Sequence, residues 1–198
     1  MFVTFEGIDG SGKSTQAALL REWLVGEGHE VVYTREPGGT DLGEGVRKLV
    51  LDGPDMTAWA EAALYASARA ELVERVVRPA RARGAWVICD RYIDSSIAYQ
   101  GIGRGLGVGR VLELNLAATR GLLPDRTFVL LVAPAEANTR STGLLDRIER
   151  EDDDFFARVD QAYRALAALF PQRVVALDGT QPPAEIAEQV REQVRALH

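Results

Sequence analysis

TFEGIDGSGKST, residues 4–15, is the stretch of sequence that decides the fold. It contains the pattern G-x-x-x-x-G-K-[ST] between Gly7 and Ser14, directly after an apolar run and directly before a helical pattern. In this context the glycines let the backbone turn tightly, so that successive N–H groups and a helix amino terminus can hold phosphate oxygens. We expect Lys13 to bring a full charge to the β- and γ-phosphates of a nucleoside triphosphate, and the Ser14 hydroxyl to hold Mg²⁺. The residues predicted to form this site are Gly7, Ile8, Asp9, Gly10, Ser11, Gly12, Lys13, Ser14 and Thr15.

The same stretch has a simpler interpretation, a glycine-rich turn with a surface lysine. The complete motif between a strand and a helix favours the triphosphate site, but it does not identify the acceptor of a phosphoryl group. A GTP-driven switch would also carry a guanine-reading N-K-x-D and a separate D-x-x-G. No N-K-x-D occurs, and the only D-x-x-G, residues 9–12, lies inside the motif. The sequence therefore favours a phosphotransferase over a switch or regulator.

Length and composition allow one domain with a substantial core. The chain has 198 residues, of which 46% are hydrophobic and 26% charged. Its net charge of -6 argues against nonspecific nucleic-acid binding and is compatible with one local positive site for a small anion. Cys89 is the only cysteine, which excludes an intrachain disulfide and is read as a small core residue. No signal peptide or membrane span is predicted, so we expect a cytoplasmic protein without a membrane partner.

Short apolar runs that alternate with helical stripes predict the fold class. The runs are continuous and rich in β-branched residues, which suits a parallel sheet covered on both faces. Stripes with helical spacing begin at Ala17, Leu64 and Ile186, and residues 154–169 are expected to be helical too. Right-handed crossovers then give a three-layer α/β sandwich. The expected strands are residues 2–5, 30–34, 85–89, 127–132 and 173–177.

The second informative stretch is VICDRYIDSSIAYQG, residues 87–101. Asp90 and Arg91 follow a predicted strand, and the carboxyl ends of parallel strands form the edge where ligands bind. A carboxylate there can order Mg²⁺, and an arginine beside it can neutralise phosphate. A local surface ion pair explains the two residues equally well. The glycine-rich residues 101–109 can be either a mobile loop or a loop that covers substrate.

Over nearly its whole length, the chain resembles the thymidylate kinases, a family of P-loop nucleoside monophosphate kinases. The motifs that carry the resemblance are the P-loop, R-E-P-G-G-T at 35–40, Y-A-S-A-R at 65–69, D-R-Y-I-D-S-S-I-A-Y-Q-G at 90–101 and L-D-R-I-E at 145–149. The resemblance implies a single domain of residues 1–198 with a five-stranded parallel sheet. It also implies a homodimer and the reaction ATP + dTMP → ADP + dTDP with Mg²⁺. Since the acceptor is a phosphate monoester, the site must hold two anions in line and spread charge, without a base.

The resemblance also assigns roles to charged residues at the sheet edge. Arg35 and Arg91 are expected to hold the acceptor phosphate. Ser14, Glu36 and Asp90 are expected to organise Mg²⁺, partly through water. The R-E-P-G-G-T stretch can otherwise be a proline-glycine turn with a surface ion pair. The implied catalytic residues are Lys13, Asp90, Arg91 and Arg147.

Two residues of a predicted helix are implied in base recognition. Tyr65 and Arg69 lie four residues apart, hence on one helix face. By resemblance Tyr65 stacks on thymine and Arg69 donates to a base carbonyl. Spacing alone would make them an aromatic at the core edge and a solvated arginine. The resemblance further places Asp9 at the deoxyribose 3′-OH, Tyr99 against the 2′ position, and Ser95, Ser96 and Gln100 near the base.

A lid is expected at about residues 138–152. Some members of the family carry a catalytic arginine inside the P-loop, at the position that is Gly10 here, so the lid has to supply this charge. Arg147 is the best-matched candidate, whereas Arg140 and Arg150 can equally be solvated helix charges. The adenine of ATP is expected near residues 178–182.

Two further functions compete with this interpretation. One is a kinase for another nucleoside monophosphate or for a deoxynucleoside. A deoxynucleoside would need a carboxylate base at its 5′-hydroxyl, and the arginine-rich acceptor side argues against it. The other is a regulator that binds a nucleoside triphosphate but turns it over slowly.

Overall fold

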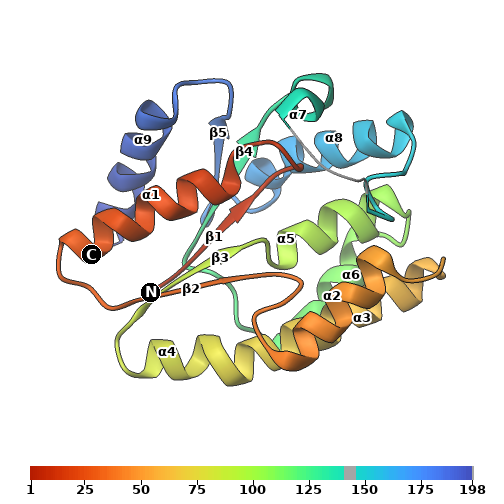
Figure 1. Cartoon of the computed structure of the whole chain (residues 1–198), viewed down its shortest axis with the longest axis horizontal. Helices are drawn as coiled ribbons and strands as arrows, with labels where there is room; N and C mark the ends of the chain where they lie inside the picture. Colours follow the sequence, from red (N-terminus) through yellow and green to blue (C-terminus); the bar gives the residue numbers. More distant parts are fainter. Residues whose placement is uncertain (141–145, 198) are drawn as a thin grey trace.

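Five parallel strands form one sheet in the order β2-β3-β1-β4-β5 in the computed structural model, which describes residues 1–140 and 146–197 (Figure 1). The predicted fold class is confirmed, because helices cover both faces of this sheet. Each observed strand begins or ends within one residue of its predicted bounds. The strands are β1 (Phe2–Glu6), β2 (Val31–Arg35), β3 (Trp86–Asp90), β4 (Arg126–Leu131) and β5 (Val174–Asp178).

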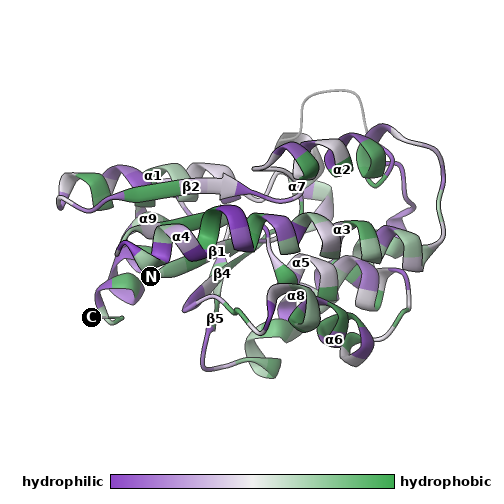
Figure 2. Cartoon of the chain, turned by 90° about the horizontal axis from the view of Figure 1, so that it is seen from below, coloured by the Kyte–Doolittle hydropathy of each residue, from purple (hydrophilic) through white to green (hydrophobic). Residues whose placement is uncertain are grey.

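Two apolar layers hold the sheet between the helices. On one face α1 (Lys13–Gly26) and α9 (Pro183–Arg195) pack on β1, with Val3, Phe5 and Leu20 among the buried residues. The second core lies on the other face, below α8 (Asp153–Leu169) and the helices that follow β2 and β3. Hydrophobic and hydrophilic residues alternate along these helices, as expected for elements with one buried side (Figure 2).

Among the longer helices, α2 (Asp41–Asp52) and α6 (Val108–Thr119) were not predicted. The hydroxyl of Thr40 caps the start of α2 by accepting from the backbone N–H of Gly43, a signal that the sequence did contain. The predicted stripe from Leu64 is α3 (Ala58–Leu72), which continues through later turns. The remaining helical segments are η1 (Val73–Val77), α4 (Arg78–Ala82), α5 (Ile93–Ser96), η2 (Ile97–Gly103) and α7 (Pro134–Arg140).

The glycine-rich residues 101–109 are only partly a loop. They begin inside η2 and end inside α6, so that only residues 104–107 connect the two. Residues 141–145 of the expected lid lie outside the described residues. No helix in the described ranges is long and apolar enough to cross a membrane.

Parallel pairing places the functional motifs together. Arg35 and Asp90 are register partners on β2 and β3, and Phe5 of β1 pairs with Asp90. The P-loop after β1, the R-E-P-G-G-T stretch from the end of β2 and the Asp90 segment therefore emerge at the same edge of the sheet, where ligands bind in open α/β folds.

Candidate active site

The P-loop lines a cavity of about 760 Å³ between α1 and the strand ends. Gly10 and Gly12 have φ angles of +78° and +96°, a region that L side chains rarely adopt, which explains both glycines. Helix α1 begins directly after Gly12 without a side-chain cap, so its first N–H groups face this end of the cavity. The other lining residues include Asp9, Lys13, Ser14, Arg35, Glu36, Arg47, Asp90, Arg91 and, from the expected adenine loop, Gly179, Thr180, Gln181 and Pro182.

Lys13 is held inside the cavity by the P-loop itself. Its Nζ donates to the carbonyl oxygen of Ile8 at 2.8 Å and lies 3.6 Å from the carboxylate of Asp9. Burial and the neighbouring Arg91 lower the pKa of Lys13, whereas Asp9 opposes this shift. Lys13 is therefore a positive charge already placed in a low-dielectric site, as the expected phosphate contact requires.

The side chains of Ser14 and Asp90, two of the residues expected to organise Mg²⁺, are in contact. The Ser14 hydroxyl donates to Oδ2 of Asp90 at 2.7 Å, although 76 residues separate them. Glu36 lines the same cavity, and its Oε1 is buried without a hydrogen-bond partner among the described residues. Hydroxyl and carboxylate oxygens are the donors that Mg²⁺ prefers, so these residues fit the ion.

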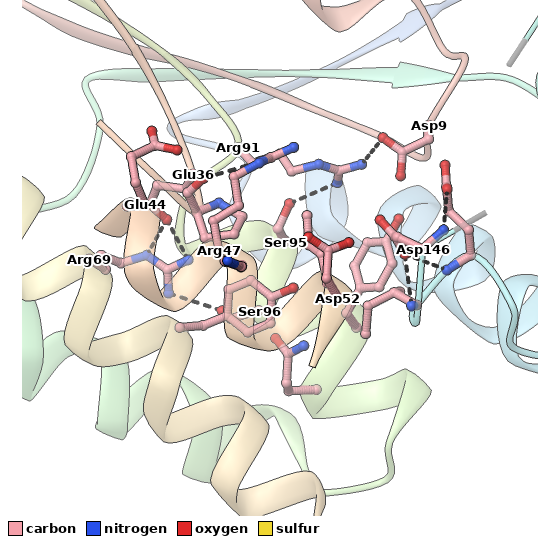
Figure 3. A pocket seen from close by; sticks show the side chains of 18 residues that line it. Asp9, Glu36, Glu44, Arg47, Asp52, Arg69, Arg91, Ser95, Ser96 and Asp146 are labelled. Atoms are coloured by element: carbon pink, nitrogen blue, oxygen red, sulfur yellow. Dashed lines mark hydrogen bonds and ion pairs between the residues drawn. The ribbon is translucent and has the colours of Figure 1, made fainter. Parts of the chain in front are cut away.

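Arg91 connects the two halves of the site. Its φ of +70° is uncommon for a residue with a side chain, and its N–H donates to the carbonyl oxygen of Phe5. The guanidinium donates to Asp9 at 2.7 Å and to Ser95 at 3.2 Å (Figure 3). It also donates to the hydroxyl of Tyr163 at 3.3 Å. The backbone is thus held in a strained conformation that points a cation at the cavity.

Asp9 lies between two cations. Although desolvation opposes ionisation, Arg91 and Lys13 lower the pKa of Asp9 below its usual range. Its carboxylate is half exposed and lines both this cavity and a second one. An ionised, accessible acceptor is what the proposed contact with a sugar hydroxyl requires.

The second cavity, of about 630 Å³, adjoins the first and contains the predicted nucleoside residues. Asp9, Glu36, Arg47 and Arg91 line both cavities, so that they form the shared rim. The walls of the second cavity come from α2, α3, the segment from β3 to η2, and residues 146–149 of the expected lid (Figure 3). The predicted residues found in it are Asp9, Glu36, Tyr65, Arg69, Arg91, Ser95, Ser96, Tyr99 and Gln100.

Arg35 lies apart from this group. It lines only the P-loop cavity, and its guanidinium binds both carboxylate oxygens of Glu44 at 3.0 Å. Both side chains are about half exposed. Such an ion pair contributes little to stability, so Arg35 can exchange Glu44 for a phosphate at small cost.

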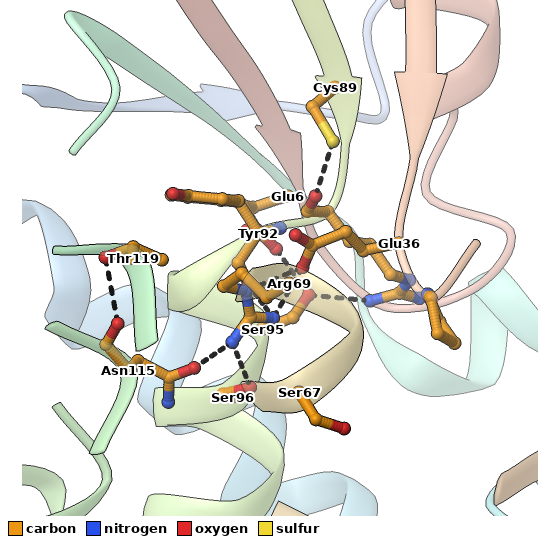
Figure 4. A network of polar contacts seen from close by, with 12 residues as sticks. Glu6, Glu36, Ser67, Arg69, Cys89, Tyr92, Ser95, Ser96, Asn115 and Thr119 are labelled. Carbon is orange, nitrogen blue, oxygen red and sulfur yellow. Dashed lines mark hydrogen bonds and ion pairs between the residues drawn. The ribbon is translucent and has the colours of Figure 1, made fainter. Parts of the chain in front are cut away.

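Arg69 lines the second cavity, and its predicted contact with the base stays a prediction. It is 1% exposed, and all three nitrogens of its guanidinium already have protein partners (Figure 4). Glu36 binds it at 2.6 and 2.7 Å, and the Tyr92 carbonyl oxygen accepts at 3.0 Å. The hydroxyl of Ser96 and the side-chain oxygen of Asn115 accept from the remaining nitrogen. Arg69 therefore positions Glu36 and Ser96, and leaves no uncommitted nitrogen for a base carbonyl.

Glu6, at the end of β1, is a site residue that the sequence analysis missed. It is fully buried and accepts from the Tyr92 N–H at 2.7 Å and from the Ser95 hydroxyl at 2.5 Å. Burial, followed by the nearby Asp94, raises the pKa of Glu6 to about 7, while hydrogen bonds and Arg91 oppose the shift. The sequence did contain a signal for Glu6: an acidic residue ends a largely apolar strand, directly before the P-loop.

Arg147 is a correction to the predicted position of the lid charge. The predicted catalytic arginine is 7% exposed and lines neither cavity. It donates to Glu61 at 2.7 Å and to the Val50 carbonyl oxygen at 2.9 Å. The guanidinium of Arg147 forms a buried ion pair with Glu61. Arg147 therefore anchors the end of the lid to α2 and α3 and does not face a cavity.

Arg140 and Arg150 are the other two arginines of the expected lid. The side chain of Arg140 lies outside the described residues, and Arg150 is exposed. Gly10 is close to the lid, because a Cβ at this position would collide with the carbonyl oxygen of Ala137 in α7. A larger P-loop residue here, such as arginine, would require α7 to move.

Arg47 was also missed. It lies on α2, which was not predicted, and donates to the carbonyl oxygen of Pro37 at 3.2 Å while it lines both cavities. Only the position of α2 beside the sheet edge brings this half-buried cation to the shared rim.

Comparison with known proteins identifies the family. The sequence profile described as Thymidylate kinase matches residues 5–190. The chain is 52% identical to a thymidylate kinase of Clavibacter michiganensis subsp. michiganensis, over 100% of this chain and 95% of that protein. It is 53% identical to one of Leifsonia xyli subsp. xyli, over 96% and 92%. A crystal structure of thymidylate kinase from Ehrlichia chaffeensis superposes with a TM-score of 0.81 at 34% identity, covering 98% of both chains. The two joined cavities and these likenesses agree: the chain belongs to the thymidylate kinase family, which phosphorylates dTMP to dTDP with ATP.

Proposed function

We propose that this chain moves the γ-phosphoryl group of ATP to dTMP across the rim that its two cavities share. The observation that carries the proposal is the position of Arg91, which lines both cavities and contacts Asp9 from a strained backbone conformation. ATP occupies the P-loop cavity, with its phosphates at Lys13 and the start of α1. The deoxynucleotide occupies the second cavity, with its phosphate at the rim.

The reaction needs placement and charge more than proton transfer. The attacking oxygen of dTMP is already anionic, so the barrier falls when both phosphates are held in line and the developing charge is neutralised. Lys13 and Arg91 supply fixed charge in a partly buried site, where electrostatic stabilisation is strongest. Arg35 and Arg47 are placed to hold the outer oxygens of the acceptor phosphate.

Ser14, Glu36 and Asp90 are the residues that would hold Mg²⁺. Bound there, the ion would neutralise charge on the ATP phosphates. Asp90 and the Ser14 hydroxyl already touch, and Glu36 is kept in place by Arg69, with one oxygen unpaired. Chelation with EDTA should stop turnover, and added Mg²⁺ should restore it.

The nucleoside of dTMP is assigned to the wall opposite the rim. Tyr65 offers an aromatic face for the base, and Tyr99 closes the side expected to carry the sugar 2′ carbon. Ser95, Ser96 and Gln100 line the same wall. Because the Ser95 and Ser96 hydroxyls are bonded to Glu6 and Arg69, they shape the cavity while Gln100 offers a polar group to the base.

The proposal is tested by ADP release in a coupled assay with ATP, Mg²⁺ and a panel of dTMP, dUMP, dCMP, dGMP and UMP. We expect the highest kcat/KM with dTMP. A better rate with another monophosphate would reassign the acceptor, and turnover with thymidine alone would overturn the placement of a phosphate at the rim.

We further propose a cytoplasmic homodimer. Leu42, Leu49 and Trp59, on α2 and at the start of α3, are large apolar side chains exposed by more than 40%, and such side chains on neighbouring helices suit a contact with a second copy. The free thiol of Cys89 suits a reducing compartment. Sedimentation velocity would test the dimer, and cell fractionation the location.

A further inference from the structure

A buried carboxylate lies behind the wall of the second cavity. Glu61 of α3 is 1% exposed, and its Oε1 accepts a hydrogen bond from the side-chain amide nitrogen of Gln100 at 2.8 Å. Gln100, in η2, is 2% exposed and lines the cavity, whereas Glu61 does not. The carboxylate therefore acts on the cavity through Gln100.

Two arginines keep Glu61 ionised. Its Oε2 accepts from Arg147 at 2.7 Å and from Arg104 at 3.1 Å, and Arg104 also reaches Oε1 at 3.3 Å. Although desolvation opposes ionisation, Gln100 and the two arginines lower the pKa of Glu61. An ionised carboxylate has no proton to donate, so the group that faces it must be a donor.

This requirement decides which end of the Gln100 amide faces the cavity. The two ends of an amide have almost the same shape, and only their hydrogen-bond partners distinguish them. With its NH₂ group turned to Glu61, Gln100 turns its carbonyl oxygen away. That oxygen accepts no hydrogen bond from the described residues, so the wall presents an acceptor without a partner.

We propose that Glu61 is a specificity-determining positioning residue, which orients Gln100 so that its carbonyl oxygen selects a pyrimidine carrying hydrogen on ring nitrogen N3. Thymine and uracil have this N–H group, whereas N3 of cytosine is an acceptor and would meet the oxygen without a proton between them. The inference rests on the proposed placement of the base in the second cavity.

The decisive variant is Glu61→Gln. Oε1 of the new amide at the position of Oε2 keeps the contacts with Arg147 and with Nη2 of Arg104, which directs its NH₂ group at Gln100. The longer contact from Nε of Arg104, at 3.3 Å, is lost. Gln100 must then turn its own carbonyl oxygen inward and present NH₂ to the cavity. The group that Gln100 presents to the cavity changes from an acceptor to a donor with almost no change in volume. The preference for a pyrimidine with hydrogen on N3 should therefore reverse or weaken.

The measurement compares kcat/KM for dTMP with kcat/KM for 5-methyl-dCMP, a pair in which the 5-methyl group is constant. We expect Glu61→Gln to lower the dTMP preference at least about 10-fold, the scale on which a mismatched buried hydrogen bond acts. A ratio cancels the amount of folded enzyme, so a loss of stability alone leaves it unchanged. A ratio within about 3-fold of the wild type would overturn the proposal.

Two matched variants complete the test. Arg104→Met removes a partner of Glu61 but leaves the bond to Gln100, so the ratio should stay near the wild-type value. Gln100→Met removes the acceptor itself and should lower the preference for dTMP; an unchanged ratio here would overturn the inference even though the kinase reaction stands.

Glu61→Gln leaves the charges of Arg104 and Arg147 without a carboxylate partner. If this variant does not fold, the double variant Glu61→Gln/Arg104→Met, which lacks one of these two charges, is measured instead. Failure of the wild type to phosphorylate dTMP would instead overturn the proposed function.

Discussion

The two cavities of this enzyme are built in different ways. The P-loop cavity takes eight of its lining residues from one continuous stretch, residues 9–16, which runs from the P-loop into the first turn of α1. Charged residues from the ends of β2 and β3 and from α2 complete it. The second cavity takes single side chains from segments that are far apart in the sequence (Figure 3). A short motif can therefore specify a phosphate site, whereas a base site depends on how several elements pack.

The difference is clearest among the arginines. Arg91 and Arg47 line both cavities, whereas Arg69 and Arg147 are at most 7% exposed and bonded to Glu36 and Glu61. All four come from motifs or helices near the site. Which of them meets a substrate depends on the carboxylates that the fold brings beside them.

The largest effect should follow from Lys13→Ala. It removes the fixed charge at the phosphates, so kcat should fall about 10³-fold or more, the scale of lost transition-state electrostatics. Steady-state kinetics with dTMP and ATP measure this, and thermal unfolding confirms that the variant is folded. Turnover close to the wild-type rate would separate the P-loop cavity from catalysis.

Arg147→Ala tests the correction to the lid assignment. Because Arg147 forms a buried ion pair, its loss should lower the free energy of unfolding by about 3 kcal/mol, while kcat stays within about 3-fold. Urea unfolding measures the first quantity and single-turnover kinetics the second. The exposed neighbour Arg150→Ala serves as the control and should change neither. A large loss of kcat with normal stability would return Arg147 to catalysis.

Glu6→Gln tests the buried carboxylate at the end of β1. The pKa of Glu6 is raised from its ordinary value of 4.5 to about 7, so the folded state holds a proton that the unfolded state has lost. The stability that Glu6 contributes is therefore present below pH 4.5 and is lost as the pH rises through 7. Between pH 5.5 and pH 8 the wild type should lose about 2 kcal/mol relative to Glu6→Gln. Urea unfolding at both values measures this, and parallel pH profiles would contradict the assignment.

Tyr99→Ala should have the smallest effect, on sugar selection. Its ring is buried and packs beside Phe155 and Tyr163, with Arg91 at 5.4 Å from the ring centroid. If the ring crowds the 2′ position, removing it should raise kcat/KM for ribothymidylate relative to dTMP about 10-fold. Tyr99→Phe keeps the ring and should leave the ratio unchanged. Equal ratios in Tyr99→Ala and the wild type would exclude this role.

The sequence alone determined the strands, the P-loop and the edge of the sheet at which the charged residues meet. These follow from local rules: apolar runs form buried strands, glycines permit the turn, and parallel strands end together. The contact between Ser14 and Asp90 was predictable for the same reason. The helix α2 was missed, although its Thr40 cap was visible, and with it the position of Arg47.

Tertiary structure decided which charges remain available to substrates. An arginine has several N–H donors, and whether they point at a ligand depends on acceptors from distant segments, which no local pattern contains. Arg69 is occupied by four residues from three separate segments, and Gln100 is oriented by Glu61, 39 residues away. Burial makes such pairings obligatory, because an unpaired polar group inside the protein costs more than the bond returns.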